Sequence, residues 1–200
     1  REGHLVPILF ASARDGTGIK ELMSAAVQYF PSPAEAPRKP FVKGEGADAK
    51  PFAYEPDPAK PLLAHVFKVT TDPFIGKLAI FRVHQGKAAG TDQVFISGSK
   101  KGTKLAHVFN LEGKEHKEAD AIIAGDIGAV AKIEDIHAGD VLALDHNLDD
   151  VRYKGTPPPT PMYGLAVSPK NRGDEQKISG ALAKITEEDP TFKVTMDRQT

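Results

Sequence analysis

The sequence predicts a mainly β protein: a closed β-barrel over residues 62–150, flanked by a small αβ segment on one side and a partial β-α-β unit on the other. Short β-type runs with turn residues between them fill the middle of the chain, without a helical period. Apolar residues spaced three and four apart occur near both ends. Proline clusters separate these blocks, since eight of the sixteen prolines lie in residues 31–61 and four more in 157–161.

These patterns give the expected boundaries. Residues 1–33 form the αβ segment, 34–61 a Pro-rich linker, 62–150 the barrel, 151–161 a second Pro-rich linker and 162–200 the β-α-β unit. With 200 residues, 40% hydrophobic content and a net charge of -1, the chain has the composition of a soluble globular protein. The balanced charge gives no global attraction to nucleic acid, so contact with RNA would depend on local basic patches.

The first block begins with a nearly continuous apolar run, Leu5 to Phe10, typical of a strand buried on both faces of a parallel sheet. The amphipathic helix that follows has its apolar residues at Ile19, Leu22, Met23, Ala26, Val27 and Phe30. Thr17 or Asp15 is expected to cap it, and Pro31 and Pro33 end it. One strand and one helix cannot bury each other, and the chain starts abruptly without Met. We therefore expect it to be a piece of a longer protein.

The barrel strands are expected at six β-type runs: residues 62–70, 78–84, 93–97, 105–111, 127–133 and 141–144. Gly90, Gly125 and Gly139 each stand in a turn before a strand, where a positive φ is useful. Six or more short strands at this spacing favour a closed barrel, which removes exposed sheet edges.

The third block is expected to form strand, helix and strand. Residues 162–167 and 191–196 are the strands, and the helix between them has Asp174 as N-cap, a buried stripe and Pro190 as its end. The stripe consists of Ile178, Ala181, Leu182 and Ile185. Such a unit is half of a ferredoxin-like domain. Because half a domain leaves strand edges and a helix face uncovered, we expect the chain to self-associate.

Several segments together resemble the elongation factor G family of translational GTPases. The most specific is Thr70-Thr71-Asp72-Pro73-Phe74-Ile75-Gly76-Lys77-Leu78-Ala79-Ile80-Phe81-Arg82-Val83, which looks like the start of that family's second domain. Four further segments follow in the family's order and spacing: Ala124-Gly125-Asp126-Ile127, Gly139-Asp140-Val141-Leu142, Ser168-Pro169-Lys170 and Glu187-Glu188-Asp189-Pro190-Thr191-Phe192. Upstream, Ser12-Ala13 resembles the guanine-binding Ser-Ala signature. Arg14 and the linker from Glu35 to Lys60 depart from the family pattern.

This resemblance implies a translation-factor-type barrel between the rear edge of a P-loop GTPase domain and the first half of the family's third domain. The Ala13 amide would face the guanine while Ser12 shapes the loop; the parent protein would use GTP or GDP with magnesium. Its partner would be the ribosome, chiefly small-subunit RNA and proteins, and its location the cytoplasm. The implied function is GTP-dependent translocation in the elongation step of protein synthesis.

The candidate RNA-binding residues are Arg82 and the basic run of Lys100, Lys101 and Lys104 on an expected hairpin tip. A solvated turn is an equally good interpretation of that run. Neither Gly-x-x-x-x-Gly-Lys-Ser/Thr nor Asn-Lys-x-Asp occurs in the sequence, so we expect no catalytic residue and no measurable GTP binding here.

The seven histidines lack metal-ligand spacing and there is no cysteine, so no metal site and no disulfide are predicted. Glu187, Glu188 and Asp189 are interpreted as a solvated helix end. No apolar run reaches the ~20 residues of a membrane span. Two alternatives stay open: a stand-alone β-barrel that binds RNA or protein without nucleotide, and a ribosomal GTPase of the release-factor or ribosome-protection type.

Overall fold

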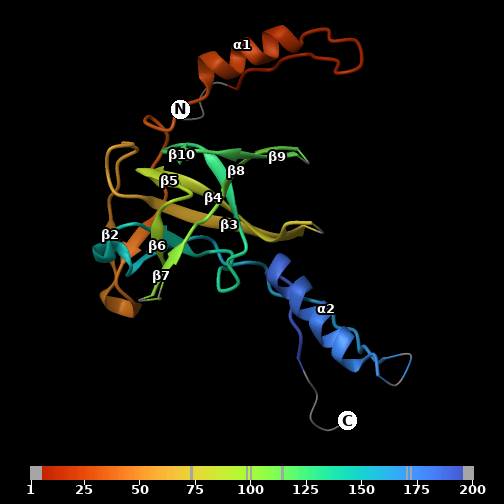
Figure 1. Cartoon of the computed structure of the whole chain (residues 1–200). Helices are drawn as coiled ribbons and strands as arrows, with labels where there is room; N and C mark the ends of the chain where they lie inside the picture. Colours follow the sequence, from red (N-terminus) through yellow and green to blue (C-terminus); the bar gives the residue numbers. More distant parts are fainter. Residues whose placement is uncertain are drawn as a thin grey trace. The chain divides into compact units, whose positions relative to one another are not determined.

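The computed structural model describes residues 6–72, 74–97, 99, 101–113, 115–169, 171 and 173–195. It divides into two compact units, Arg1–Pro37 and Arg38–Thr200, drawn together in Figure 1 and described separately below.

The first unit consists of an extended segment and helix α1 (Ile19–Tyr29). The helix was predicted correctly, but its N-cap is Gly18, with φ 73°, in place of Thr17 or Asp15. A Cβ at Gly18 would lie 2.2 Å from the carbonyl oxygen of Phe10, so only glycine fits there. The predicted strand was wrong for residues 6–10, which are extended and unpaired, while Leu5 lies outside the described residues. A strand buried on both faces needs neighbouring strands, and in this unit Ile8 and Phe10 are exposed.

The second unit is built on a large antiparallel sheet (Figure 1). Among the described residues its strands pair in the order β7-β6-β12-β3-β4-β11-β8-β9. Their bounds are β3 (Leu63–Asp72), β4 (Gly76–Gln85), β6 (Gln93–Ile96), β7 (Gly102–Lys104), β8 (Val108–Glu112), β9 (Glu115–Ala119), β11 (Ile127–Ala131) and β12 (Val141–Ala143). Each of the six predicted β-type runs overlaps one of these strands.

Alternation along the central β3–β4 hairpin separates two faces. Ala64, Val66, Phe81 and Val83 are fully buried in the main core. Residues of opposite parity, such as His65 and Arg82, face away from it, as the two-residue period of a strand requires. A register shift between Val66 and Lys68 marks a β-bulge, which increases the local twist of the hairpin.

The closed barrel expected from the sequence is not confirmed. In the described residues the eight-strand order has two unpaired ends, β7 and β9, so no sheet is closed. Instead, β5 (Lys87–Ala89) and β10 (Ala121–Ile123) pair as a separate ribbon. Its buried Ile122 packs so tightly on β11 that a Cβ at Gly128 would lie 2.5 Å from Ile122 Cγ1. The curved sheet therefore covers its core by side-chain packing as well as by strand pairing.

The glycine turns were predicted correctly in part. Gly125 and Gly139 both have a φ of 101°, whereas Gly90 does not have a positive φ. A Cβ at Gly90 would instead lie 2.7 Å from the carbonyl oxygen of Ala106. Glycine is therefore needed there for the close approach of two backbones.

Residues expected as linkers contribute a second, smaller sheet. Its strand order is β13-β1-β2, with bounds β1 (Phe41–Lys43), β2 (Lys50–Phe52) and β13 (Val151–Tyr153). A 3-10 turn, Gly46–Asp48, joins β1 to β2, and a second one, His146–Leu148, precedes β13. Phe41, Tyr54 and Val151 are buried with Leu63 and Val141 in a separate cluster. This sheet therefore packs against the outer face of the large one.

Helix α2 (Glu175–Glu188) forms where a helix was predicted, with Asp174 at the N-cap position but without a side-chain capping bond. The flanking strands were wrong: residues 162–167 and 191–195 form no strand, and Met196 lies outside the described residues. The stripe is not a buried one either, since Ala181 and Ile185 are exposed. Within the described residues these strands find no partners, and a strand needs one to satisfy its backbone groups.

Candidate functional site

The loop before α1 holds the predicted guanine-contact residues. The Ser12 amide donates to the Thr17 carbonyl oxygen at 2.9 Å, and the Gly16 amide donates to the Ser12 carbonyl oxygen at 3.0 Å. A hydrogen bond from the Ser12 side chain, followed by one from the Thr17 amide, holds the pKa of Asp15 below its ordinary value. Ala13 is exposed in the turn. The loop is thus fixed at both ends and presents Ala13 outward.

The predicted basic hairpin tip is the connection between β6 and β7. Lys101 lies in this connection, whereas Lys104 is the last residue of β7 and pairs with Gln93, away from the tip. Both are exposed, and Lys100 lies outside the described residues. The Lys101 amide donates to Ser99 Oγ at 3.2 Å. Where the connection leaves β6, the Val141 amide of β12 donates to Ser97 Oγ at 2.6 Å, which ties the hairpin to the sheet. Exposed cations on an anchored loop are suited to contacting phosphate groups.

Arg82 lies apart from this tip. It is half-buried on β4, opposite His65 of β3 and Ile127 of β11. Strands β12 and β3 separate β4 from β6, which at ~4.8 Å per strand amounts to roughly 14 Å. The structure therefore does not bring the four predicted RNA-binding residues into one cluster.

The outer face of the β3–β4 hairpin carries a histidine and aromatic cluster that the sequence did not reveal. The rings of His65 and His84 are 5.9 Å apart, and His84 packs edge-on against Phe41 at 5.1 Å and Tyr54 at 5.3 Å. Burial lowers the pKa of each imidazole to about 4, and Lys39 adds to the effect on both. Both rings are therefore neutral at pH 7, and they fasten the small sheet to the large one.

Glu187 and Glu188 at the end of α2 contact the sheet, so their interpretation as part of a solvated helix end was wrong; Asp189 accepts hydrogen bonds from Thr191 of its own segment. Glu187 Oε2 lies 3.2 Å from Lys77 Nζ, and the Lys77 side chain is only 7% exposed. Glu188 Oε1 accepts a hydrogen bond from the Thr71 amide at 2.6 Å. Lys77 Nζ also donates to the Glu134 carbonyl oxygen at 2.6 Å. We call these groups the α2 latch; they join the Glu-Glu-Asp-Pro segment to the Thr70–Val83 segment.

Over the described ranges, no group of three or more His, Asp or Glu side chains is placed to hold a metal ion. In the same ranges, no helix has the length and apolar character needed to cross a bilayer.

Two family models match the chain, one after the other. "Elongation factor G domain 2" matches residues 61–145, and "Elongation Factor G, domain III" matches residues 158–200. Elongation factor G of Ureaplasma urealyticum serovar 10 is 34% identical to this chain over 199 residues. The chain belongs to the elongation factor G family. The matched residues include the sheet, its basic hairpin and both sides of the α2 latch.

Further relatives agree with this assignment. The elongation factor G proteins of two Ureaplasma parvum serovar 3 strains are also 34% identical over 199 residues. In all three alignments 98% of this chain is covered but only 28% of the relative. A crystal structure of a protein from Thermus thermophilus superposes with a TM-score of 0.67 at 29% identity, covering 92% of this chain and 24% of that one. The chain thus spans about 28% of the length of its elongation factor G relatives.

Proposed function

We propose that this chain is the docking part of a translational GTPase that promotes GTP-dependent translocation on the ribosome during elongation. The observation that carries the proposal is the match to two successive elongation factor G domains, at residues 61–145 and 158–200. The anchored hairpin with Lys101 and Lys104 supplies a surface for small-subunit RNA. The α2 latch supplies a connection through which the two domains could move together.

The proposed nucleotide role of this chain is limited to one edge of the guanine site. The exposed Ala13 amide would face the base, and Ser12 would hold the loop through its bonds to Thr17, Gly16 and Asp15. GTP or GDP with magnesium would be held mainly by other segments of the parent protein. We expect calorimetry on this chain to detect no micromolar GTP binding. The cytoplasm is the proposed location, because ribosomes work there.

Binding of the chain to purified small ribosomal subunits tests the proposal. Wild-type chain should bind at low salt, with an affinity that falls as salt rises. The variant Lys101→Glu/Lys104→Glu should bind about tenfold more weakly and show a shallower salt dependence, since it reverses two phosphate contacts. Lys177→Glu on α2, an exposed cation outside the hairpin, is the matched control. Absence of binding by the wild type, or equal affinity of all three, would refute the proposal.

We also propose that the chain self-associates at high concentration. Met162, Tyr163 and Leu165 are more than three-quarters exposed, and Val194 is half exposed. Apolar side chains gathered on a surface favour association. A monomeric mass by light scattering at high concentration would contradict this.

A further inference from the structure

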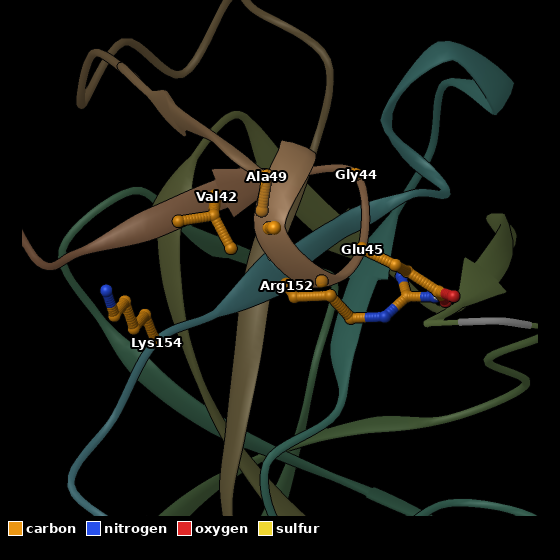
Figure 2. A pocket seen from close by; sticks show the side chains of 8 residues that line it. Val42, Gly44, Glu45, Ala49, Arg152 and Lys154 are labelled. Carbon is orange, nitrogen blue, oxygen red and sulfur yellow. The ribbon is translucent and has the colours of Figure 1, made fainter.

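A pocket of about 500 Å³ lies on the outer face of the small β13-β1-β2 sheet. Val42 of β1 stands opposite Arg152 of β13, and Lys154 follows two residues later on the same face. The loop Gly44–Ala49 forms the rim, where Glu45 stands among glycines and alanines. Figure 2 shows Arg152 directed toward Glu45 on one side of the pocket and Lys154 on the other side.

The pocket lies in a locally basic part of a nearly neutral chain. Residues 38–50 and 150–154 contain six basic side chains against three acidic ones. The basic ones are Arg38, Lys39, Lys43, Lys50, Arg152 and Lys154. Lys43 is engaged by the Asn147 carbonyl oxygen at 2.7 Å and by Asp150 at 3.7 Å. Lys154 is exposed at the pocket, where its charge faces solvent.

Arg152 is positioned for an anion. Its Nη1 donates to the carbonyl oxygens of Asp149 at 2.8 Å and Val151 at 3.3 Å, which fixes the guanidinium. Its Nη2 contacts Glu45 Oε1 at a long 3.4 Å, and the Glu45 side chain is 82% exposed. An exposed carboxylate at that distance is a weak counter-ion, so a phosphate group could displace it.

We propose that this pocket binds the sugar-phosphate backbone of ribosomal RNA, with one phosphate at Arg152 and a neighbouring one at Lys154. The inference rests on the proposed ribosome docking and adds a contact surface distinct from the β6–β7 hairpin tip. The Glu45 carboxylate must move away from Arg152 before the phosphate can bind there. None of the described residues that line the pocket has an aromatic side chain on which a base could stack, so recognition is of the backbone and carries no base sequence.

Two substitutions that break the Arg152–Glu45 ion pair test the proposal, because they should change binding to the ribosomal subunit in opposite directions. Arg152→Met should weaken binding of the chain to small ribosomal subunits by about fivefold and lower the magnitude of the salt slope by about 0.7–0.9. Glu45→Gln removes the competing carboxylate and should strengthen binding about twofold to threefold. A purely structural ion pair predicts that both variants change binding in the same direction.

Three further measurements complete the design. Lys154→Met should weaken binding as Arg152→Met does. Lys117→Met is the control: Lys117 is an exposed cation on β9, ion-paired with Glu112, and its substitution should leave binding unchanged. Inorganic phosphate, added at constant ionic strength, should compete no better than chloride. Competition by millimolar phosphate would indicate a free-anion site and overturn the RNA assignment.

The outcomes separate the two proposals. If wild-type chain does not bind the subunits, ribosome docking and this inference both fail. If the wild type binds and the hairpin variant is weakened, but Arg152→Met, Lys154→Met and Glu45→Gln all behave as wild type, only the pocket assignment is overturned. Weakening by both Glu45→Gln and Arg152→Met would likewise overturn it.

Discussion

The strands of the large sheet and the segment after residue 154 both contain many apolar residues, but these are buried in the sheet and largely exposed in the segment. In the sheet, side chains such as Phe81 and Val83 are fully buried. Beyond residue 154, Met162 is 94% exposed and Ile185 is 44% exposed. The difference is the availability of partners: every strand of the sheet has a neighbour, whereas residues 162–167 pair with nothing in the described part of the chain. An apolar pattern stabilises a structure only when another surface covers it.

The largest expected effect is a core truncation within the sheet. Phe81→Ala should lower the free energy of unfolding by about 3–5 kcal/mol, because it removes a fully buried ring and leaves a cavity. Met162→Ala should change the free energy of unfolding by less than about 0.5 kcal/mol, since the Met162 side chain is almost fully exposed. Urea unfolding followed by circular dichroism measures both. Similar costs for the two variants would mean that residue 162 is covered in solution.

The histidine cluster makes the junction of the two sheets sensitive to acid. The pKa of His84 falls from an ordinary 6.5 to about 4 on folding, so the unfolded chain binds more protons between these values. Stability should therefore decline as pH falls from about 6.5 to 4, by about 3 kcal/mol for His84 alone, and then level off with respect to this group. Unfolding measured at several pH values should show this slope.

Removing the imidazoles provides the control for that slope. His65→Phe/His84→Phe keeps aromatic rings in the cluster but carries no titratable nitrogen, so most of the decline between pH 6.5 and 4 should vanish. Within the described part of the chain, His84 Nε2 is buried and has no hydrogen-bond partner, so losing this atom should cost little at pH 7. An unchanged slope in the double variant would assign the acid sensitivity to other groups.

Two glycines should respond to alanine with opposite signs. Gly86 has a φ of 75°, and a Cβ there would lie 2.5 Å from the Lys60 carbonyl oxygen; Gly86→Ala should cost about 2 kcal/mol. Gly180 lies within α2, where an added Cβ would have nothing within 4 Å, so Gly180→Ala should stabilise the helix by about 1 kcal/mol. Urea unfolding reports the first and far-ultraviolet circular dichroism the second. A loss of helicity in Gly180→Ala would show that a partner packs closely there.

These contrasts explain what could be predicted from the sequence. The β3–β4 hairpin and α2 follow local patterns, so alternation and helical spacing were sufficient to find them. Strand β1 could not be found this way, because Phe41 pairs with Tyr153, far along the chain, and the flanking prolines gave it the appearance of a linker. The strand expected from residue 5 onward was wrong over residues 6–10 for the opposite reason: its pattern was strong, but the described residues contain no strand that pairs with it.

The residues of the candidate site also fall into those that local sequence patterns predict and those that they do not. Lys101 lies in the β6–β7 connection, where it was expected, because charge and turn residues are local features; Lys104 instead pairs with Gln93 at the other end of β7. The α2 latch joins Lys77 to Glu187, and the basic pocket joins Glu45 to Arg152; the members of each pair lie far apart in the sequence. Single-sequence patterns carry no signal for such pairs, although Lys77 and Glu187 both lie in segments that resemble the family.

The smallest expected effect concerns the α2 latch, which holds the segment after residue 154 to the large sheet. Lys77→Met keeps the apolar stem in its nearly buried position and removes the charge; Glu187→Gln removes the partner charge. In a double-mutant cycle the coupling between them should be about 0.5–1 kcal/mol, because Glu187 is 42% exposed and water screens the pair. Amide exchange in the last turn of α2 should quicken in both single variants, while exchange in β4 stays slow.

The control is Lys184→Met, on an exposed part of the same helix, which should leave the amide exchange of α2 and of β4 unchanged. Zero coupling, with unaltered exchange, would mean that α2 moves independently of the sheet and transmits nothing to it.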